Sequence, residues 1–237
     1  MEVVRIERPI RSSGGRSLAL GRLRGGGRVI VKTFGDPLRC RTEMRAVERI
    51  RDSGADRSLY PSLVAGIGRA LEDREVAWAA EPPRASDHPR TILYECCGAL
   101  SGPRPAAPRV MLPDGLIAGH MRDVFAVVAD LHGRAGLVHG DLRPGSFARD
   151  SDGLRLVELD TCAEPGPRAA AADSWALGLI LHSAAHGYPD DAAGLPRGSW
   201  ANPLAPLAAD LAARLMRPAP AERLRATDAL RHPLFHR

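Results

Sequence analysis

The chain has 237 residues, of which 44% are hydrophobic and 26% are charged. These proportions are typical of a globular protein and exclude a disordered or fibrous chain. No run approaches the roughly 20 consecutive apolar residues that a membrane-spanning helix needs, so no membrane association is expected. The N-terminal stretch MEVVRIERPIRSS contains no apolar signal-peptide segment. This predicts a cytoplasmic protein, with the nucleus as the alternative and a host cell if the gene is viral.

The net charge of +5 does not by itself indicate a nucleic-acid partner, because the arginines are scattered and aromatic residues make up only 4% of the chain. Nucleic-acid binding is therefore not expected. Of the 33 basic residues, only Lys32 is a lysine. The four cysteines show no metal-ligand spacing and are typical of reduced thiols.

Short strands and one helix are predicted for the N-terminal part of the chain. RSLALGRL (residues 16–23) and GRVIVKTF (residues 27–34) are apolar-rich runs separated by a glycine turn, which indicates a β-hairpin. Residues 39–54 carry apolar side chains at helical spacing. Residues 74–83 and 90–97 are two further predicted strands.

The C-terminal part has a helical pattern. A Gly- and Pro-rich segment over residues 98–115 predicts an irregular connection. Helices are then predicted over residues 114–136, 171–187, 205–216 and 225–235, and the second of these is apolar enough to be buried. The chain is therefore expected to be of the α+β class, with strands before helices.

The chemistry-bearing stretch is VHGDLRPGSF at residues 138–147, followed by LRLVELD at residues 154–160. Phosphoryl transfer requires a cation on the nucleotide phosphates, carboxylates for magnesium, and a carboxylate facing the attacking hydroxyl. The stretch has these parts in order, and here the sequence resembles the protein kinase superfamily over nearly the whole chain. The resemblance implies one bilobal domain over 1–237: a small antiparallel β-rich N-lobe with one helix (1–95) and a larger, mainly α-helical C-lobe (96–237).

VIVK resembles the V-A-I-K strand of that family, which implies that Lys32 pairs with the α and β phosphates of ATP. TEMRAVERI resembles the helix that follows this strand in the family, and the resemblance implies that a glutamate of this helix pairs with the lysine. Glu43 is favoured over Glu48, because the apolar residues that follow Glu43 at +3, +4 and +7 would turn it toward the core. The only lysine of an arginine-rich chain stands where the family requires a flexible point charge.

Two other segments carry implied nucleotide contacts. The glycine-rich phosphate cover would lie in IRSSGGRSLALG, where only Gly14 and Gly15 are available and G-x-G-x-x-G cannot be written. TILYECCGAL resembles the segment that links the lobes and binds adenine through its backbone, with Glu95 and Cys97 after the pocket residue Tyr94. ATP is therefore the implied cofactor.

HGDLRPGS resembles the catalytic loop H-R-D-L-x-x-x-N, and His139 and Asp141 match it. Asp141 would orient or deprotonate the hydroxyl nucleophile. Arg143 stands where Ser/Thr kinases carry a lysine near the transferred phosphate. Gly140 replaces the arginine that reads a phosphorylated activation loop, and Ser146 replaces the magnesium-binding asparagine with a shorter, weaker ligand.

The magnesium segment D-F-G aligns with Glu158, Leu159 and Asp160. Glutamate is one methylene longer than aspartate, and the octahedral geometry of magnesium tolerates little misplacement, so the change weakens or relocates the ion. Asp160 offers a substitute carboxylate by a shift of one residue. The sequence does not decide whether Glu158 or Asp160 would be the metal ligand, or whether magnesium binds.

Only 12 residues separate Asp160 from Asp173, so most of the family's substrate-binding activation segment is missing. DSWALGLIL resembles a buried family helix, and Asp173 is expected to brace the loop around His139. PAERLRATDALRHPLF resembles the closing segment, in which Arg223 would pair with a glutamate; Glu164 is the candidate.

Three functions are compatible with these residues. The favoured one is a pseudokinase that regulates or scaffolds a protein partner, another kinase or a signalling protein, with the binding of ATP left open. The alternative is a divergent Ser/Thr protein kinase that uses Asp141 together with Glu158 or Asp160. The third is a small-molecule phosphotransferase, since HGDLRPGS also resembles the pattern H-G-D-x-H-P-G-N of aminoglycoside and choline kinases.

Overall fold

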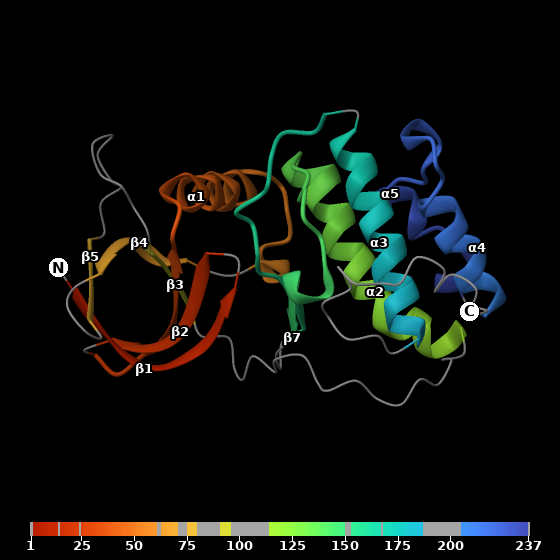
Figure 1. The fold of residues 1–237 in the computed structure, drawn as a ribbon. Coiled ribbons are helices and arrows are strands. Elements are labelled where there is room, and N and C mark those ends of the chain that lie inside the picture. The colour runs from red at the N-terminus through yellow and green to blue at the C-terminus, as the bar shows by residue number, and fades with distance from the viewer. Residues whose placement is uncertain are drawn as a thin grey trace.

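The computed structural model describes residues 2–13, 15–23, 25–60, 63–70, 75–79, 91–95, 114–149, 153–166, 168–186 and 205–236. These residues form a mixed α and β structure. Antiparallel strands from the N-terminal part gather at one end of the molecule, and most of the helices gather at the other (Figure 1). The helix α1 lies beside the strands, on the side that faces the helical region (Figure 1).

The strands of the N-terminal part form one antiparallel sheet in the order β1-β2-β3-β6-β4-β5, and pairing of β5 with β1 closes it. Their bounds are β1 (Glu2–Ser13), β2 (Arg16–Leu23), β3 (Arg28–Phe34), β4 (Leu63–Ala70), β5 (Glu75–Ala79) and β6 (Thr91–Glu95). The predicted hairpin is β2 with β3, in a register that places Leu18 opposite Lys32. The sequence analysis did not single out β1, because five of its 12 residues are charged and its pairing with β2 and β5 is a tertiary effect.

Helix α1 (Pro37–Asp52) begins where the sequence supplies a cap. The side chain of Asp36 accepts a hydrogen bond from the backbone N–H of Leu38 at 2.8 Å, and Pro37 occupies the first turn, where its missing N–H costs nothing. The helix therefore starts two residues before the predicted range. Its buried side chains recur at helical spacing, so one face of α1 is turned inward.

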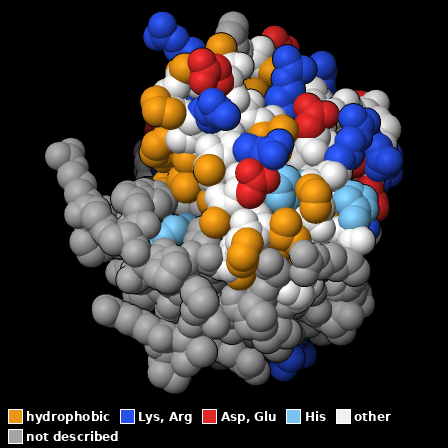
Figure 2. Space-filling model, turned by 90° about the vertical axis from the view of Figure 1, so that its right-hand side faces the viewer, with side chains coloured by type: hydrophobic (Ala, Val, Ile, Leu, Met, Phe, Trp, Pro, Cys, Tyr) orange, Lys and Arg blue, Asp and Glu red, His pale blue; other side chains and the backbone are white. Residues whose placement is uncertain are grey.

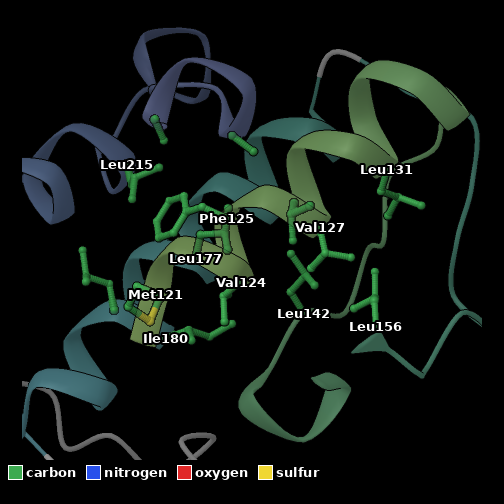
Figure 3. Close-up of a cluster of buried hydrophobic side chains, with 14 of the residues drawn as sticks. Met121, Val124, Phe125, Val127, Leu131, Leu142, Leu156, Leu177, Ile180 and Leu215 are labelled. Carbon is green, nitrogen blue, oxygen red and sulfur yellow. The ribbon is translucent and has the colours of Figure 1, made fainter. Parts of the chain in front are cut away.

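The helical region surrounds the largest apolar cluster of the described chain (Figure 3). Its helices are α2 (Asp114–Asp130), α3 (Ala169–His186), α4 (Pro206–Leu215) and α5 (Ala226–Ala229). A short hairpin of β7 (Phe147–Arg149) and β8 (Leu154–Leu156) lies beside them. Phe125 of α2 packs on Phe235 with ring centroids 5.3 Å apart, and Leu177 of α3 and Leu215 of α4 are fully buried in the same cluster.

One predicted helix has the expected extent but not a uniform geometry, and another is interrupted. The first is α-helical to Asp130, continues as a wide π-helical turn over Leu131–Ala135 and stops at Gly136, whose φ of 61° is left-handed. The last predicted helix is not continuous: α5 is one turn, and a separate 3₁₀ turn follows over Pro233–Phe235. Pro233 has no N–H to donate and disfavours helical backbone in the residue before it, so the helix cannot run through.

The described surface of the helical region carries acidic and basic side chains that are intermixed, without a purely basic area on the face shown (Figure 2). No helix in the described part of the chain is long and apolar enough to cross a membrane. The predicted boundary after Glu95 and most of the predicted irregular connection lie outside the described residues, as do Gly14 and Cys97.

Candidate functional site

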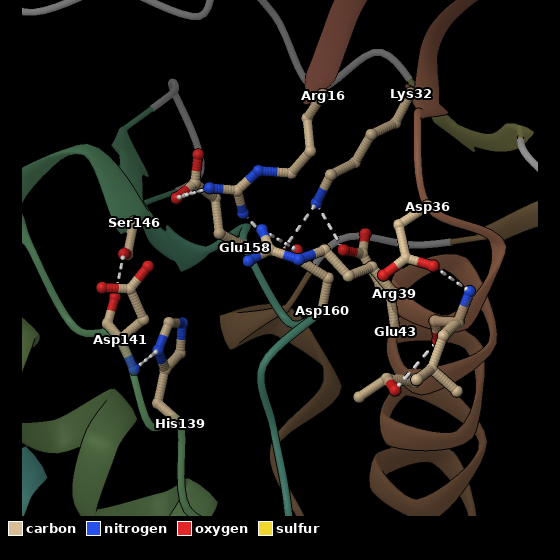
Figure 4. Close-up of polar contacts among 12 residues, drawn as sticks. Arg16, Lys32, Asp36, Arg39, Glu43, His139, Asp141, Ser146, Glu158 and Asp160 are labelled. Carbon is tan, nitrogen blue, oxygen red and sulfur yellow. Dashed lines mark hydrogen bonds and ion pairs between the residues drawn. The ribbon is translucent and has the colours of Figure 1, made fainter. Parts of the chain in front are cut away.

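The charged residues that the sequence analysis singled out meet at the junction between the sheet, α1 and the helical region (Figure 4). Lys32 comes from β3, and its ammonium group forms an ion pair with Glu43 of α1. Both side chains are buried, Lys32 being only 2% exposed. Glu48, the other glutamate considered, is exposed. The ring of Phe34 lies 5.1 Å from the Lys32 ammonium and adds a cation–π contact.

Asp173 of α3 anchors the loop that carries the HGD motif. Its carboxylate accepts hydrogen bonds from the backbone N–H groups of His139 at 2.7 Å and Gly140 at 2.9 Å, and it contacts the ring of His132 at 2.9 Å. Gly140 has a φ of 82°, and a Cβ there would lie 3.1 Å from the carbonyl oxygen of Thr161. The positive φ and this close contact both favour glycine at position 140.

His139 is a structural residue of the same loop. Its ring is buried, and Nδ1 accepts a hydrogen bond from the backbone N–H of Asp141 at 3.3 Å. Burial lowers the pKa of His139, while the nearby Asp173 carboxylate acts in the opposite direction. The imidazole is therefore held neutral and acts as an acceptor that shapes the turn before Asp141.

Asp141 is the most accessible carboxylate of the site, with its side chain 50% exposed, and Arg143 contacts it at 3.3 Å. Ser146 is buried instead. Its hydroxyl donates to the carbonyl oxygen of Asp141 at 3.3 Å and accepts from the backbone N–H of Arg143 at the same distance. The hydroxyl predicted as a metal ligand thus closes the 3₁₀ turn Pro144–Ser146.

Glu158 and Asp160, the other two predicted metal ligands, are buried and paired with cations of the chain. Glu158 lies 3.2 Å from Arg143 and 3.6 Å from Arg16. Asp160 accepts a hydrogen bond from Arg16 and lies 3.4 Å from Arg39. Among the described residues, no group of three or more His, Cys, Asp or Glu side chains is arranged to hold a metal ion.

Arg16 is the residue that the sequence analysis missed. It is the first residue of β2, and its guanidinium reaches across the junction to both buried carboxylates (Figure 4). A signal was present in the sequence, since Arg16 follows Gly14 and Gly15 in the predicted phosphate cover. Gly15 itself has a φ of 73°, and its carbonyl accepts the N–H of Gly35 at 2.7 Å, which ties this turn to the end of β3.

The remaining predicted residues lie away from the junction or have other partners. Glu95 ends β6 in register with Val29 of β3. Glu164 was only the candidate partner of Arg223, and the contacts of Arg223 in the described structure are with other residues. Its guanidinium donates to the carbonyl oxygens of Arg217 and Ala171 and lies 4.8 Å from the Trp175 ring, while Glu164 is exposed.

The chain matches no protein-family model and no curated protein. The two described cysteines, Cys40 and Cys162, are not suited to act as nucleophiles. Burial raises the pKa of Cys40 to about 12, and burial also raises the pKa of Cys162, so neither forms a reactive thiolate near neutral pH.

Proposed function

We propose that this protein is a pseudokinase of bilobal kinase-like fold that regulates or scaffolds a protein partner and does not transfer phosphate with magnesium. The sheet with α1 would be the N-lobe, and the helical region the C-lobe. The Lys32–Glu43 ion pair and the loop anchored by Asp173 support the kinase-like part of this proposal, since the sequence resemblance implies both contacts.

The pairing of Glu158 and Asp160 with arginines of the same chain is the observation that carries the pseudokinase part. Magnesium requires near-octahedral oxygen ligands at about 2.0–2.1 Å. Here Arg143 and Arg16 contact the Glu158 carboxylate, and Arg16 donates to Asp160. A divalent cation at these oxygens would lie against guanidinium groups, and electrostatic repulsion would oppose it. The residues present therefore do not fit a magnesium ion.

ATP meets a related obstacle. Lys32, which would hold its phosphates, is buried beside Glu43, the partner that the resemblance implies, and its ammonium also lies 3.9 Å from Asp160. A phosphate at this ammonium would compete with the Asp160 carboxylate. The same ion pairs link β2, β3 and α1 to the segment that carries Asp160, so they favour one fixed arrangement of the lobes, which is what a scaffolding or regulatory partner protein would recognise.

A divergent active Ser/Thr kinase is the second candidate, because one observation favours it. Asp141, the carboxylate assigned to the hydroxyl nucleophile, is half-exposed and lies beside Arg143 at 3.3 Å. An acceptor hydroxyl could therefore reach a carboxylate with a neighbouring cation, as phosphoryl transfer requires.

Phosphate transfer measured with labelled ATP separates these two functions. Wild-type protein and the D141N variant are incubated with magnesium or manganese and a generic protein substrate, and in a second arm with an aminoglycoside and with choline. The pseudokinase proposal expects equal background labelling in both proteins. Transfer by the wild-type protein that is lost in D141N would refute it, and the acceptor that is labelled would identify the kind of kinase.

A further inference from the structure

Asp160 is a single carboxylate that three cations approach from three different elements. Arg16 of β2 donates a hydrogen bond to Oδ1, Arg39 of α1 lies 3.4 Å from Oδ2, and the ammonium of Lys32 on β3 lies 3.9 Å from Oδ1. Figure 4 shows these side chains converging on Asp160 from the strands and from α1. Each of its two oxygens therefore has a cationic neighbour.

Two of the three cations around Asp160, Arg16 and Lys32, are shielded from water. The Asp160 side chain is fully buried, and the side chains of Arg16 and Lys32 are 6% and 2% exposed. Nearby carboxylates satisfy part of this positive charge, because Glu43 pairs with Lys32 and Glu158 lies 3.6 Å from Arg16. If the Asp160 carboxylate were removed, buried guanidinium and ammonium groups would lose an anion that solvent cannot replace. A negative charge at the position of Asp160 is therefore strongly favoured.

The type of cation and the route of access indicate which external anion could hold that position. Guanidinium groups bind phosphate through paired N–H donors, and a lysine ammonium binds it as a point charge. Arg39 has a side chain that is 42% exposed, so one of the three cations reaches solvent, whereas Arg16 and Lys32 are buried. A phosphate group entering beside Arg39 would meet the other two cations in turn.

We propose that Asp160 occupies, within its own chain, an anion-binding site for a phosphate or pyrophosphate group that needs no metal ion. The carboxylate and the external phosphate compete for Arg16, Lys32 and Arg39. Phosphate therefore binds weakly to the wild-type protein and tightly once the Asp160 carboxylate is absent. This inference deepens the proposed function, because it uses the same site and explains how the site is kept from its ligand.

The test is the binding of inorganic pyrophosphate in the presence of EDTA, measured by calorimetry and by thermal unfolding. The D160N variant is expected to bind pyrophosphate at least about tenfold more tightly than the wild-type protein, the gain expected from charge-assisted hydrogen bonds that the carboxylate no longer occupies. Adding R39Q to D160N removes the solvent-side cation and should reverse most of this gain. ATP in EDTA forms a second arm, which shows whether an adenosine group adds affinity to the phosphates.

The matched control is D228N. Asp228 is 46% exposed and lies 3.6 Å from Arg231, so the substitution makes the same change of charge at an ordinary surface ion pair. D228N is expected to bind pyrophosphate as weakly as the wild-type protein. The proposal is overturned if D160N binds no more tightly than D228N, or if R39Q leaves the affinity of D160N unchanged.

A D160N chain that does not fold in chloride is refolded in pyrophosphate and in chloride at equal ionic strength. Recovery of folded protein only in pyrophosphate supports the proposal, and no recovery in either salt overturns it. The outcome is distinguishable from that of the transfer assay. Phosphate transfer by the wild-type protein would refute the pseudokinase but not the anion site, whereas unchanged affinity in D160N would refute the anion site alone.

Discussion

The helical region and the junction with the sheet are both buried, but by different kinds of residue. In the helical region, Phe125, Leu177 and Leu215 are fully buried among other apolar side chains. In the junction, the buried side chains include Lys32 and Asp160, each within reach of opposite charge. Burial of apolar surface is favourable wherever the surface is covered, at roughly 25 cal/mol per Å². Burial of charge is tolerated only in a specific arrangement, because the desolvation cost offsets most of the attraction.

This difference separates what stabilises the fold from what specifies its site. The apolar cluster contributes most of the stability, and it accepts many sequences of similar volume. The charged junction contributes little net free energy, but each of its members depends on the others for a counter-charge. Substitutions in the two regions should therefore differ both in size and in whether a second substitution can compensate for them.

The largest effect is expected in the apolar cluster. Phe125→Ala removes a ring that packs on Phe235 and should lower the free energy of unfolding by about 4 kcal/mol, because it leaves a cavity as well as losing apolar burial. Urea unfolding followed by circular dichroism measures it. Leu38→Ala is the control, since this side chain is 62% exposed, and its change should stay within about 0.5 kcal/mol. Equal effects of the two substitutions would show that the cluster is not the stabilising core.

The next effect separates the two glutamates of α1. Glu43→Gln leaves the buried ammonium of Lys32 without its carboxylate and should lower the free energy of unfolding by about 3 kcal/mol. Glu48→Gln makes the same chemical change on the exposed face and should alter it by less than about 0.5 kcal/mol. A further substitution of Lys32 by Met should recover part of the loss caused by Glu43→Gln. If the double variant is no more stable than E43Q, the ion pair does not account for the loss.

The smallest effect concerns pH and the loop before Asp141. Burial lowers the pKa of His139, so the folded protein binds this proton less readily than the unfolded chain does. The stability that depends on neutral His139 is complete above about pH 6.5, the usual histidine pKa, and is lost as the pH falls below it. Between pH 7 and pH 5, His139→Gln should flatten the pH dependence of the unfolding free energy by at most about 1.4 kcal/mol per pH unit.

The control for this pH experiment is His236→Gln, because His236 is exposed. Its pH dependence between pH 7 and pH 5 should parallel that of the wild-type protein. If the free energy of unfolding depends on pH equally in His139→Gln and in the wild type, the buried His139 imidazole does not contribute to this pH dependence.

Local pattern was sufficient to predict several elements of this fold. Alternation and a glycine turn predicted the β2–β3 hairpin, and helical spacing predicted all of α2 and α4 and most of α1 and α3. The errors have physical causes. β1 depends on its partner strands rather than on its own charged sequence, and the last predicted helix is interrupted at Pro233 because proline cannot continue the backbone hydrogen bonds.

The contacts of the site likewise include some that the local sequence predicted and some that it did not. The order of apolar residues after Glu43 was enough to place it, rather than Glu48, on the inner face of α1. The local sequence placed Arg16 within the predicted phosphate cover, but it did not indicate that Arg16 would reach Asp160, which lies 144 positions away along the chain. An arginine is usually solvent-exposed, so its burial could be recognised only once the carboxylates that neutralise it were in place.

The sequence by itself determined which residues are apolar and at what spacing, and hence which faces of the strands and helices turn inward. It also determined the types of charged group that the junction would contain. Only the tertiary structure decided how those charges pair, because ion pairing depends on distances of a few ångströms between segments that are remote in the chain. That pairing gives Glu158 and Asp160 cationic partners within the protein, while backbone groups of the same loop bind the Ser146 hydroxyl.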